Sequence, residues 1–347
     1  MHQHKAFHLT RSLIVFLGAR LGLGLGLGLG LGLGLGLGLG AALPLQAQSY
    51  PSKPVRIIVG VPPGGFTDSV ARFITPKLVE TLGQQFTVEN RTGASGIIAV
   101  EAAMKSTNDG YTLLMSTNAE MAVNPHVLAK IPYDPLRDFV PIVPVAFGAL
   151  VVAANNAAGI NTLEELISNA RAKPGALSYA SAGNGTVNHL AGEWLNSAAK
   201  ISIVHVPYKG GGPAASDVVG GQIPLGVLAA AAALPHMKSG RVKGLAVTSA
   251  KRLSFAPNLP TVAESGIPGY EVTLWAGFFA QPGVPREVVS RINAEVNRAL
   301  KLADVRERLS GIAAEVLGGT PEDLSALVKT DFERYGRIAR ENRIRAD

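Results

Sequence analysis

The chain has 347 residues, 47% of them hydrophobic and 16% charged, which is enough for one large or two medium domains around a sizeable core. Its formal net charge is +7, and it contains no block of Lys and Arg, so the charge gives no indication of a nucleic-acid partner. The lack of cysteine excludes disulfides, thiolate metal ligands, cysteine nucleophiles and lipid attachment through cysteine.

The first 48 residues have the order of a secretory signal peptide. A basic and then apolar start is followed by Leu-Gly pairs from Leu21 to Gly40, and then by small residues suited to cleavage near Ala47. The Leu-Gly tract is long enough to span a bilayer, but glycine at every second position makes it a poor helix. We therefore interpret residues 1–48 as a signal peptide with a low-complexity tract, in preference to a retained membrane anchor.

After residue 49, short apolar runs alternate with amphipathic stretches. Residues 55–61 form a continuous Val/Ile run, which predicts a strand covered on both faces. Residues 70–82 then have the apolar spacing of a helix, which Pro76 should kink. Further strands are predicted over 86–90 and 111–117, each followed by a helix.

The same alternation continues to the end of the chain. Thr162 and Glu165 form a capping-box pair that begins another helix, and the chain is helical and charged from Pro285 onward. Strands that alternate with helices throughout predict parallel sheets flanked by helices.

Two apolar segments, about 144–155 and 272–283, have the character of crossings between two domains. The roughly 120 residues between them have their own alternation of strands and helices. We expect an inserted domain joined by two extended strands, which is a hinge design. Lobe 1 is then assigned to 49–149 and 276–347, and lobe 2 to 150–275.

Four glycine-rich segments each join a strand to a helix. They are PPGGFTD (62–68), NRTGASG (90–96), SAGNGTVNH (181–189) and YKGGGPAASD (208–217). Glycine lets the backbone approach a ligand closely, and a helix start presents free N–H groups at the positive end of its dipole. At the carboxyl ends of parallel strands, several such turns predict a crevice for an anion such as a carboxylate. One such turn alone is usually structural, and four leave the two interpretations about even.

Signatures of catalysis and of nucleotide binding are missing from the sequence. There is no GxxxxGK[ST], no GxSxG and no HExxH, and SAGNGTVN lacks the third glycine of GxGxxG. His189 and Glu193 share a helical face, but a metal site needs a further ligand. A capping or ligand-contact role is therefore the better interpretation for His189.

Single polar and aromatic residues near the turns allow two interpretations. Asp68 and Asp217 stand near helix starts, where they either contact a ligand or only compensate the helix dipole. Lys209 is either the partner of an anion or solvated. Phe66 has little core to join in an exposed glycine turn, whereas Trp194 and Trp275 fit core or hinge packing.

Seven segments between residue 50 and about residue 340 resemble the solute receptors of tripartite tricarboxylate transporters, the Bug-type receptors. They are YPSKPVRIIVGVPPGGFTD, NRTGASGIIA, DGYTLLMST, YASAGNGTVNHLAGE, HVPYKGGGPAASDVVGGQI, LPHMKSGRVKGLAVTSAKR and LPTVAESGIPGYEVTLWAGFFAQPGVP. The resemblance implies an α/β, two-lobed periplasmic binding protein fold of type II, with hinge-linked Rossmann-like lobes and the ligand in the cleft between them.

The resemblance also implies a function without enzyme activity, cofactor or metal. An exported, monomeric receptor in the periplasm would capture a small mono-, di- or tricarboxylate by backbone amides and ordered waters, and pass it to membrane transporter subunits. The positions that match the family's binding turns are Gly64, Gly65, Phe66, Asp68, Ala94, Ser95, Gly96, Ser116, Thr117, Ser181, Gly183, Asn184, Thr186, His189, Tyr208, Lys209 and Asp217.

One departure from the family pattern and two alternative functions remain open. Residues 226–232 are apolar where the family often has polar or aromatic residues, so the pocket here should be more apolar. The alternatives are a sensory receptor that presents a bound carboxylate to a membrane signalling partner, and an enzyme that acts on a carboxylate.

Overall fold

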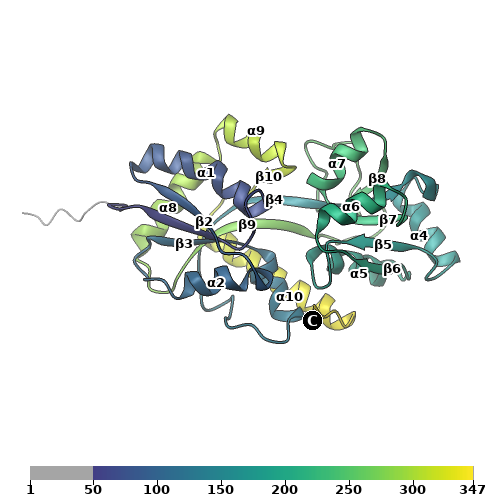
Figure 1. Cartoon of the computed structure of the whole chain (residues 1–347), viewed down its shortest axis with the longest axis horizontal. Helices are drawn as coiled ribbons and strands as arrows, with labels where there is room; N and C mark the ends of the chain where they lie inside the picture. The colour runs from purple at the N-terminus through teal and green to yellow at the C-terminus, as the bar shows by residue number, and fades with distance from the viewer. Residues whose placement is uncertain (1–49, 347) are drawn as a thin grey trace, which may run out of the picture. The chain divides into compact units, whose positions relative to one another are not determined.

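The computed structural model describes residues 50–346, which Figure 1 shows as ribbons. The predicted signal peptide, residues 1–48, lies outside the described residues. Within this range, none of the helices combines the length and the apolarity that crossing a bilayer requires.

The first and last segments of the described chain fold together as one part of the molecule, and the segment between them forms a second part. The first part contains β1 (Val55–Val59), α1 (Phe66–Leu82), β2 (Phe86–Asn90), η1 (Ala94–Gly96), α2 (Ile97–Met104), β3 (Thr112–Thr117), η2 (Ala119–Val123) and α3 (Asn124–Val127). After β4 (Val140–Asn155), the second part contains η3 (Asn156–Ala158), α4 (Leu163–Ala172), β5 (Ser178–Ser181), α5 (Val187–Ala199), β6 (Val204–Pro207), α6 (Gly211–Val219), β7 (Leu225–Ala229), α7 (Ala230–Lys238) and β8 (Val242–Val247). The return contains β9 (Thr273–Ala280), α8 (Arg286–Ala299), α9 (Ala303–Gly311), β10 (Ala314–Val316) and α10 (Pro321–Glu341).

We call β1 to α3 together with β9 to α10 lobe 1, and η3 to β8 lobe 2 (Figure 1). The strand expected from the Val/Ile run is β1, in which Val55, Ile57 and Val59 are fully buried. It pairs in parallel with both β2 and β3. Ile57 packs on one face with Ile74 of α1, and Ile58 packs on the other face with Val100 of α2, so helices cover both faces of the strand. The helix expected over 70–82 is α1, which continues as one helix through Pro76.

Each lobe has a parallel sheet, as expected, but the two are joined by antiparallel strands. In lobe 2, β5 pairs in parallel with β6 and β7. The first half of β4 pairs antiparallel with β9, from Val140 opposite Ala280 to Ala149 opposite Thr273. Its second half pairs antiparallel with β7 and β8. The sheet is therefore mixed, because the two crossing strands run against each other in the middle of it.

Helix α10 packs on both lobes. It begins with a capping box of Thr320 and Asp323, and its buried Tyr335 and Ile338 share a hydrophobic cluster with Leu190 of α5 and Val123 of η2. A movement of lobe 2 relative to lobe 1 would therefore have to change the packing of this helix.

Candidate functional site

Asp68 braces the first glycine turn from inside. Its carboxylate accepts hydrogen bonds from the Gly64 amide at 2.9 Å and from Asn90 Nδ2 at 2.8 Å, and Arg72 Nε lies 3.0 Å from each of its oxygens. Burial alone raises the pKa of Asp68, but these donors outweigh burial and hold the pKa below its usual value. The side chain is 1% exposed, so the structure shows it supporting the turn, and a direct ligand contact stays a prediction.

Some backbone amides of this turn donate hydrogen bonds within the protein, and others, which we call open amides, have no acceptor there. The Gly65 amide donates to Pro62 O at 3.0 Å, and Gly65 is the N-cap of α1 but has no side chain to cap it. The first-turn amides of Phe66 and Thr67 therefore have no intrahelical acceptor. The half-buried Phe66 ring packs toward β4, since a β-carbon at Gly148 would lie 3.6 Å from it. The open amides are therefore those of Phe66 and Thr67, whereas the amides of Gly64 and Gly65 already have acceptors.

The second turn holds three successive residues in the left-handed region. Ala94, Ser95 and Gly96 have φ values of 47°, 53° and 86°. Two of these residues carry a β-carbon, so the turn stores strain of the kind that often occurs in ligand-binding loops. Asn124 Nδ2 donates to Ser95 O at 2.8 Å and fixes the turn from α3, while the side chains of Ala94 and Ser95 are exposed.

The Glu120 carboxylate accepts hydrogen bonds from the polar groups at the end of β3. Its Oε2 accepts from Ser116 Oγ at 3.1 Å, from the Thr117 amide at 2.9 Å and from Thr117 Oγ1 at 2.5 Å. Sequence reasoning chose Ser116 and Thr117 and missed Glu120. The available signal was the spacing of three and four residues that separates Glu120 from the two hydroxyls.

In lobe 2, Ser181 and Thr186 hold the third turn together. Ser181 Oγ accepts from the Gly183 amide at 3.1 Å, and Thr186 Oγ1 donates to Gly183 O at 2.7 Å. Thr186 is also the N-cap of α5, where it accepts from the His189 amide at 3.3 Å. The amides of this turn are therefore largely satisfied by side chains, whereas Asn184 is exposed at its tip.

Two histidines stack beneath this turn. The rings of His189 and His205 lie 3.8 Å apart at an angle of 11°, and His205 Nε2 lies 2.6 Å from Ser181 Oγ. Burial lowers the pKa of each ring to about 4, and for His189 the neighbouring His205 adds to the effect. Both rings are therefore neutral at pH 7. Because His189 Nδ1 accepts from the Gly185 amide, its proton is placed on Nε2. Sequence reasoning missed His205, which only the pairing of β5 with β6 brings to this position.

The residues weighed as metal ligands have other partners. Glu193 Oε1 accepts from Tyr179 Oη at 2.8 Å instead of facing a metal with His189. Over residues 50–346, no group of three His, Asp or Glu side chains is arranged to hold a metal ion.

The fourth turn leads into α6. Tyr208 Oη donates to Asp217 Oδ2 at 2.6 Å, and this bond, together with burial, raises the pKa of Tyr208 to about 12. Lys209 is exposed, and the N-cap of α6 is Gly210, at φ 111° and without a side chain for capping. The Gly211 amide, at the first position of α6, is left without an intrahelical acceptor.

Helix starts capped by glycine therefore occur in both lobes. Helices α1 and α6 begin at Gly65 and Gly210, whereas α4 and α5 begin at Thr162 and Thr186, whose side chains cap the helix. Both α1 and α6 follow the carboxyl end of a parallel strand, which is where open α/β sheets bind ligands.

Of the apolar segment 226–232, only Ala231 lines a cavity that also touches lobe 1. Ala231 and Leu234 of α7, with Phe255, line a cavity of about 560 Å³ together with Ser310 and Ala313 of lobe 1. Lys238 and Glu307 also line this cavity, and none of its lining residues belongs to the four turns. The expectation of a more apolar pocket at the turns therefore stays a prediction.

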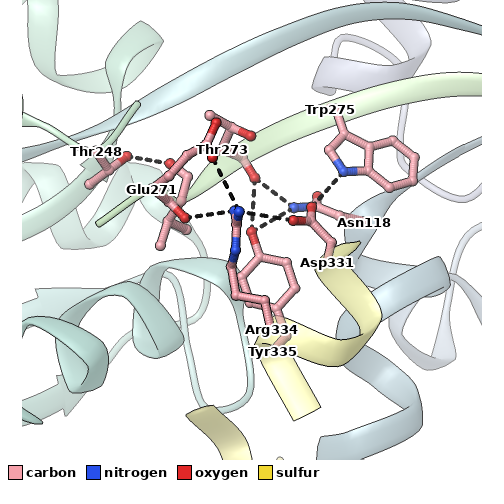
Figure 2. A network of polar contacts seen from close by, with 9 residues as sticks. Asn118, Thr248, Glu271, Thr273, Trp275, Asp331, Arg334 and Tyr335 are labelled. Atoms are coloured by element: carbon pink, nitrogen blue, oxygen red, sulfur yellow. Dashed lines mark hydrogen bonds and ion pairs between the residues drawn. The ribbon is translucent and has the colours of Figure 1, made fainter. Parts of the chain in front are cut away.

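A polar network holds the segment that returns from lobe 2 into β9 (Figure 2). Arg334 Nη1 of α10 donates to Glu271 O at 3.0 Å, and Arg334 Nη2 lies 3.2 Å from Glu271 Oε2. The Asp331 carboxylate accepts from Trp275 Nε1 at 2.7 Å and from Arg334 Nη1 at 3.3 Å. Burial raises the pKa of Asp331 to about 6, although both donors oppose the rise.

Further hydrogen bonds tie the two crossing strands together at one point. Thr248 Oγ1 donates to Val272 O at 2.6 Å and accepts from the Leu150 amide of β4 at 2.9 Å. Asn118 Nδ2, just past β3, donates to Thr273 O at 2.6 Å (Figure 2). These bonds lie where lobe 1 joins lobe 2, which suits a hinge, although the hinge motion and the lobe boundaries stay predictions.

The sequence model of one protein family, described as "Tripartite tricarboxylate transporter family receptor", matches residues 70–344. The chain belongs to this receptor family. Among relatives, Protein BugT of Bordetella pertussis is 35% identical over 301 residues, which cover 86% of this chain and 92% of BugT. The resemblance noted from the seven segments is thereby confirmed.

Solved structures of similar receptors confirm the fold. R. palustris Rpa4515 with adipate has a TM-score of 0.76 at 34% identity, covering 85% of this chain and 99% of that chain. The periplasmic binding protein BugD has a TM-score of 0.71 at 32% identity, covering 85% and 99%. This receptor therefore has the mixed α/β fold of type II periplasmic binding proteins.

Proposed function

We propose that this chain is a periplasmic receptor that captures a small carboxylated metabolite between its lobes and delivers it to membrane subunits of a tripartite tricarboxylate-type transporter. The observation that carries the proposal is that α1 in lobe 1 and α6 in lobe 2 each begin after a glycine N-cap, directly past the carboxyl end of a parallel strand. Membership of a receptor family supports the binding role, and the adipate bound to Rpa4515 supports a carboxylate as ligand. The periplasmic relative BugD supports the compartment.

The chemistry follows from the open amides. A carboxylate placed between the starts of α1 and α6 accepts hydrogen bonds from amides such as those of Thr67 and Gly211, and it meets the positive end of each helix dipole. Each lobe supplies part of this set, so the ligand binds the closed arrangement of the lobes more tightly than the open one. Water excluded on closure makes each of these charge-assisted bonds stronger.

The amide of Gly211 can be removed without disturbing the helix. Proline is well tolerated at the first position of a helix, where the N–H has no helical partner, and a β-carbon at Gly211 meets open space. Gly211→Pro removes one donor, and Gly211→Ala adds a side chain while keeping that donor. After a thermal-shift screen of mono-, di- and tricarboxylates finds a ligand, calorimetry should show Gly211→Pro binding it roughly tenfold or more weakly than Gly211→Ala.

Equal affinities of the two variants would exclude the amide of α6 from the site. Transport is tested separately, because deletion of the receptor should abolish uptake of the same acid by the cells that carry it. Normal uptake after deletion would contradict delivery to a transporter without contradicting binding.

A further inference from the structure

One carboxylate of lobe 1 stands where three turns meet. Glu120 follows the end of β3, and its carboxylate lies beside Gly60, directly after β1, and beside Gly96, the last residue of η1. β1 pairs with both β2 and β3, so the carboxyl ends of these parallel strands lie at one edge of the sheet. This edge is the one that carries the first two glycine turns.

The two oxygens of this carboxylate differ in their environment. Oε2 accepts the three hydrogen bonds from Ser116 and Thr117, whereas no hydrogen bond within residues 50–346 reaches Oε1. A β-carbon at Gly60 would lie 3.4 Å from Oε1, and one at Gly96 would collide with it. Both positions are glycine, so Oε1 is next to bare backbone, and no side chain of these two residues covers it.

Water, or a polar group of a bound ligand, can reach this oxygen. Glu120 as a residue is 6% exposed, but Oε1 is not one of the fully enclosed side-chain atoms of residues 50–346 that lack a partner, so it can accept a hydrogen bond from outside the protein. A hydroxyl or amino group on a ligand would satisfy it, whereas a second carboxylate would be repelled by the like charge.

We infer that Glu120 Oε1 accepts a hydrogen bond from an N–H or O–H group of the bound acid. The receptor then selects acids whose far end carries a hydrogen-bond donor over acids whose far end is a second carboxylate. The inference rests on the proposed function, because it concerns the same ligand site.

Acids of equal length that differ only at the far end test the inference. Hexanoate, 6-hydroxyhexanoate, 6-aminohexanoate and adipate form one such series, and butyrate, 4-hydroxybutyrate, 4-aminobutyrate and succinate form a shorter one. By calorimetry, the wild-type protein should bind the better of the hydroxy and amino acids of one series about tenfold more tightly than the diacid of that series. Glu120→Gln, which keeps the size and removes the charge, should reduce this ratio about tenfold by improving the diacid and weakening the amino acid.

Glu101→Gln is the control. The Glu101 side chain lies on α2, is 37% exposed and pairs with Lys105 at the surface, so the substitution removes one carboxylate charge from lobe 1 without changing Glu120. It should leave the ranking of the acids as in the wild type. Equal binding of diacid and donor-bearing acid by the wild type would overturn the inference even if Glu120→Gln failed to fold. An unchanged ranking in a folded Glu120→Gln protein would overturn it as well. If none of the eight acids binds the wild type, the inference fails, while the proposed function is decided separately by the screen of mono-, di- and tricarboxylates. Binding without discrimination overturns the inference and leaves that function standing.

Discussion

Asp68 shows how one side chain sets the shape of a binding turn. Its carboxylate holds the Gly64 amide and Asn90 Nδ2, and these bonds fix the course of the chain between β1 and α1. The open amides of α1 begin only after this braced segment. We therefore expect any effect of Asp68 on binding to act through the geometry of the turn.

Asp68→Asn should destabilise the protein by about 1–3 kcal/mol at pH 7, because buried donors lose a charged acceptor. The pKa of Asp68 is depressed, so its stabilising contribution is present above its unfolded pKa, near 4, and is lost as the pH falls below that value. Urea unfolding at pH 7 and pH 3 measures the difference between mutant and wild type, which should shrink at pH 3. Glu80→Gln is a matched control on the same helix, since Glu80 is 63% exposed and its ion pair with Lys77 contributes little. A constant difference at both pH values would contradict this role of Asp68.

Helix α10 links the return segment to both lobes. Arg334 and Asp331 form hydrogen bonds with Glu271 and Trp275 (Figure 2). Tyr335 and Ile338 of the same helix pack in the hydrophobic cluster that includes α5. The buried Asp331 lies at the centre of this arrangement. Burial of an ionised carboxylate is unfavourable, and its two donors offset only part of that cost.

Asp331 should make the protein more stable in mild acid. Its pKa is about 6 in the folded state against 3.8 unfolded, so the folded state takes up the proton first, and stability increases as the pH falls from about 6 toward 4. Relative to Asp331→Asn, the wild type should gain about 1–3 kcal/mol between pH 7.5 and 4.5 in urea unfolding. His189 and His205, with lowered pKa values, act in the opposite direction over this range, but they are present in both proteins and cancel. A wild type that loses stability relative to Asp331→Asn in acid would show that the Asp331 carboxylate is net stabilised by Arg334 and Trp275.

The molecule as a whole consists of two parallel sheets joined by β4 and β9. The Thr248 hydroxyl joins the Leu150 amide of β4 to the Val272 carbonyl just before β9. A change in the angle between the lobes would therefore alter the backbone near these residues and the packing of α10. The open amides of α1 and α6 belong to different lobes. A ligand that both helices bind therefore couples binding to the position of the lobes.

Binding of the cognate acid should reduce the radius of gyration measured by small-angle X-ray scattering. The physical reason is that only the closed arrangement lets both helix starts contact one carboxylate. Gly211→Pro at the same ligand concentration should show a smaller reduction, since fewer molecules are bound. An unchanged radius with saturating ligand would contradict closure as the binding mode.

The sequence by itself determined the local structure of this receptor and its family. Apolar patterns located β1 and α1, and the Thr162/Glu165 pair located the capped start of α4, because these signals depend on neighbours a few residues away. The glycines of the first and fourth turns precede helix starts without side-chain caps, whereas the third turn leads to α5, which the Thr186 side chain caps. In the first turn, the Gly64 and Gly65 amides themselves are already used.

The tertiary structure alone decided which distant residues complete the site. The pairing of β4 with β9, the stack of His205 on His189 and the Arg334 network all join residues far apart in the chain, and the approach of Glu120 to Gly60 and Gly96 joins separate turns. Contacts of this kind depend on how elements pack, and packing buries surface without leaving a periodic signal in the sequence. The turns were therefore predictable, while the side chains that satisfy or leave open their polar groups were not.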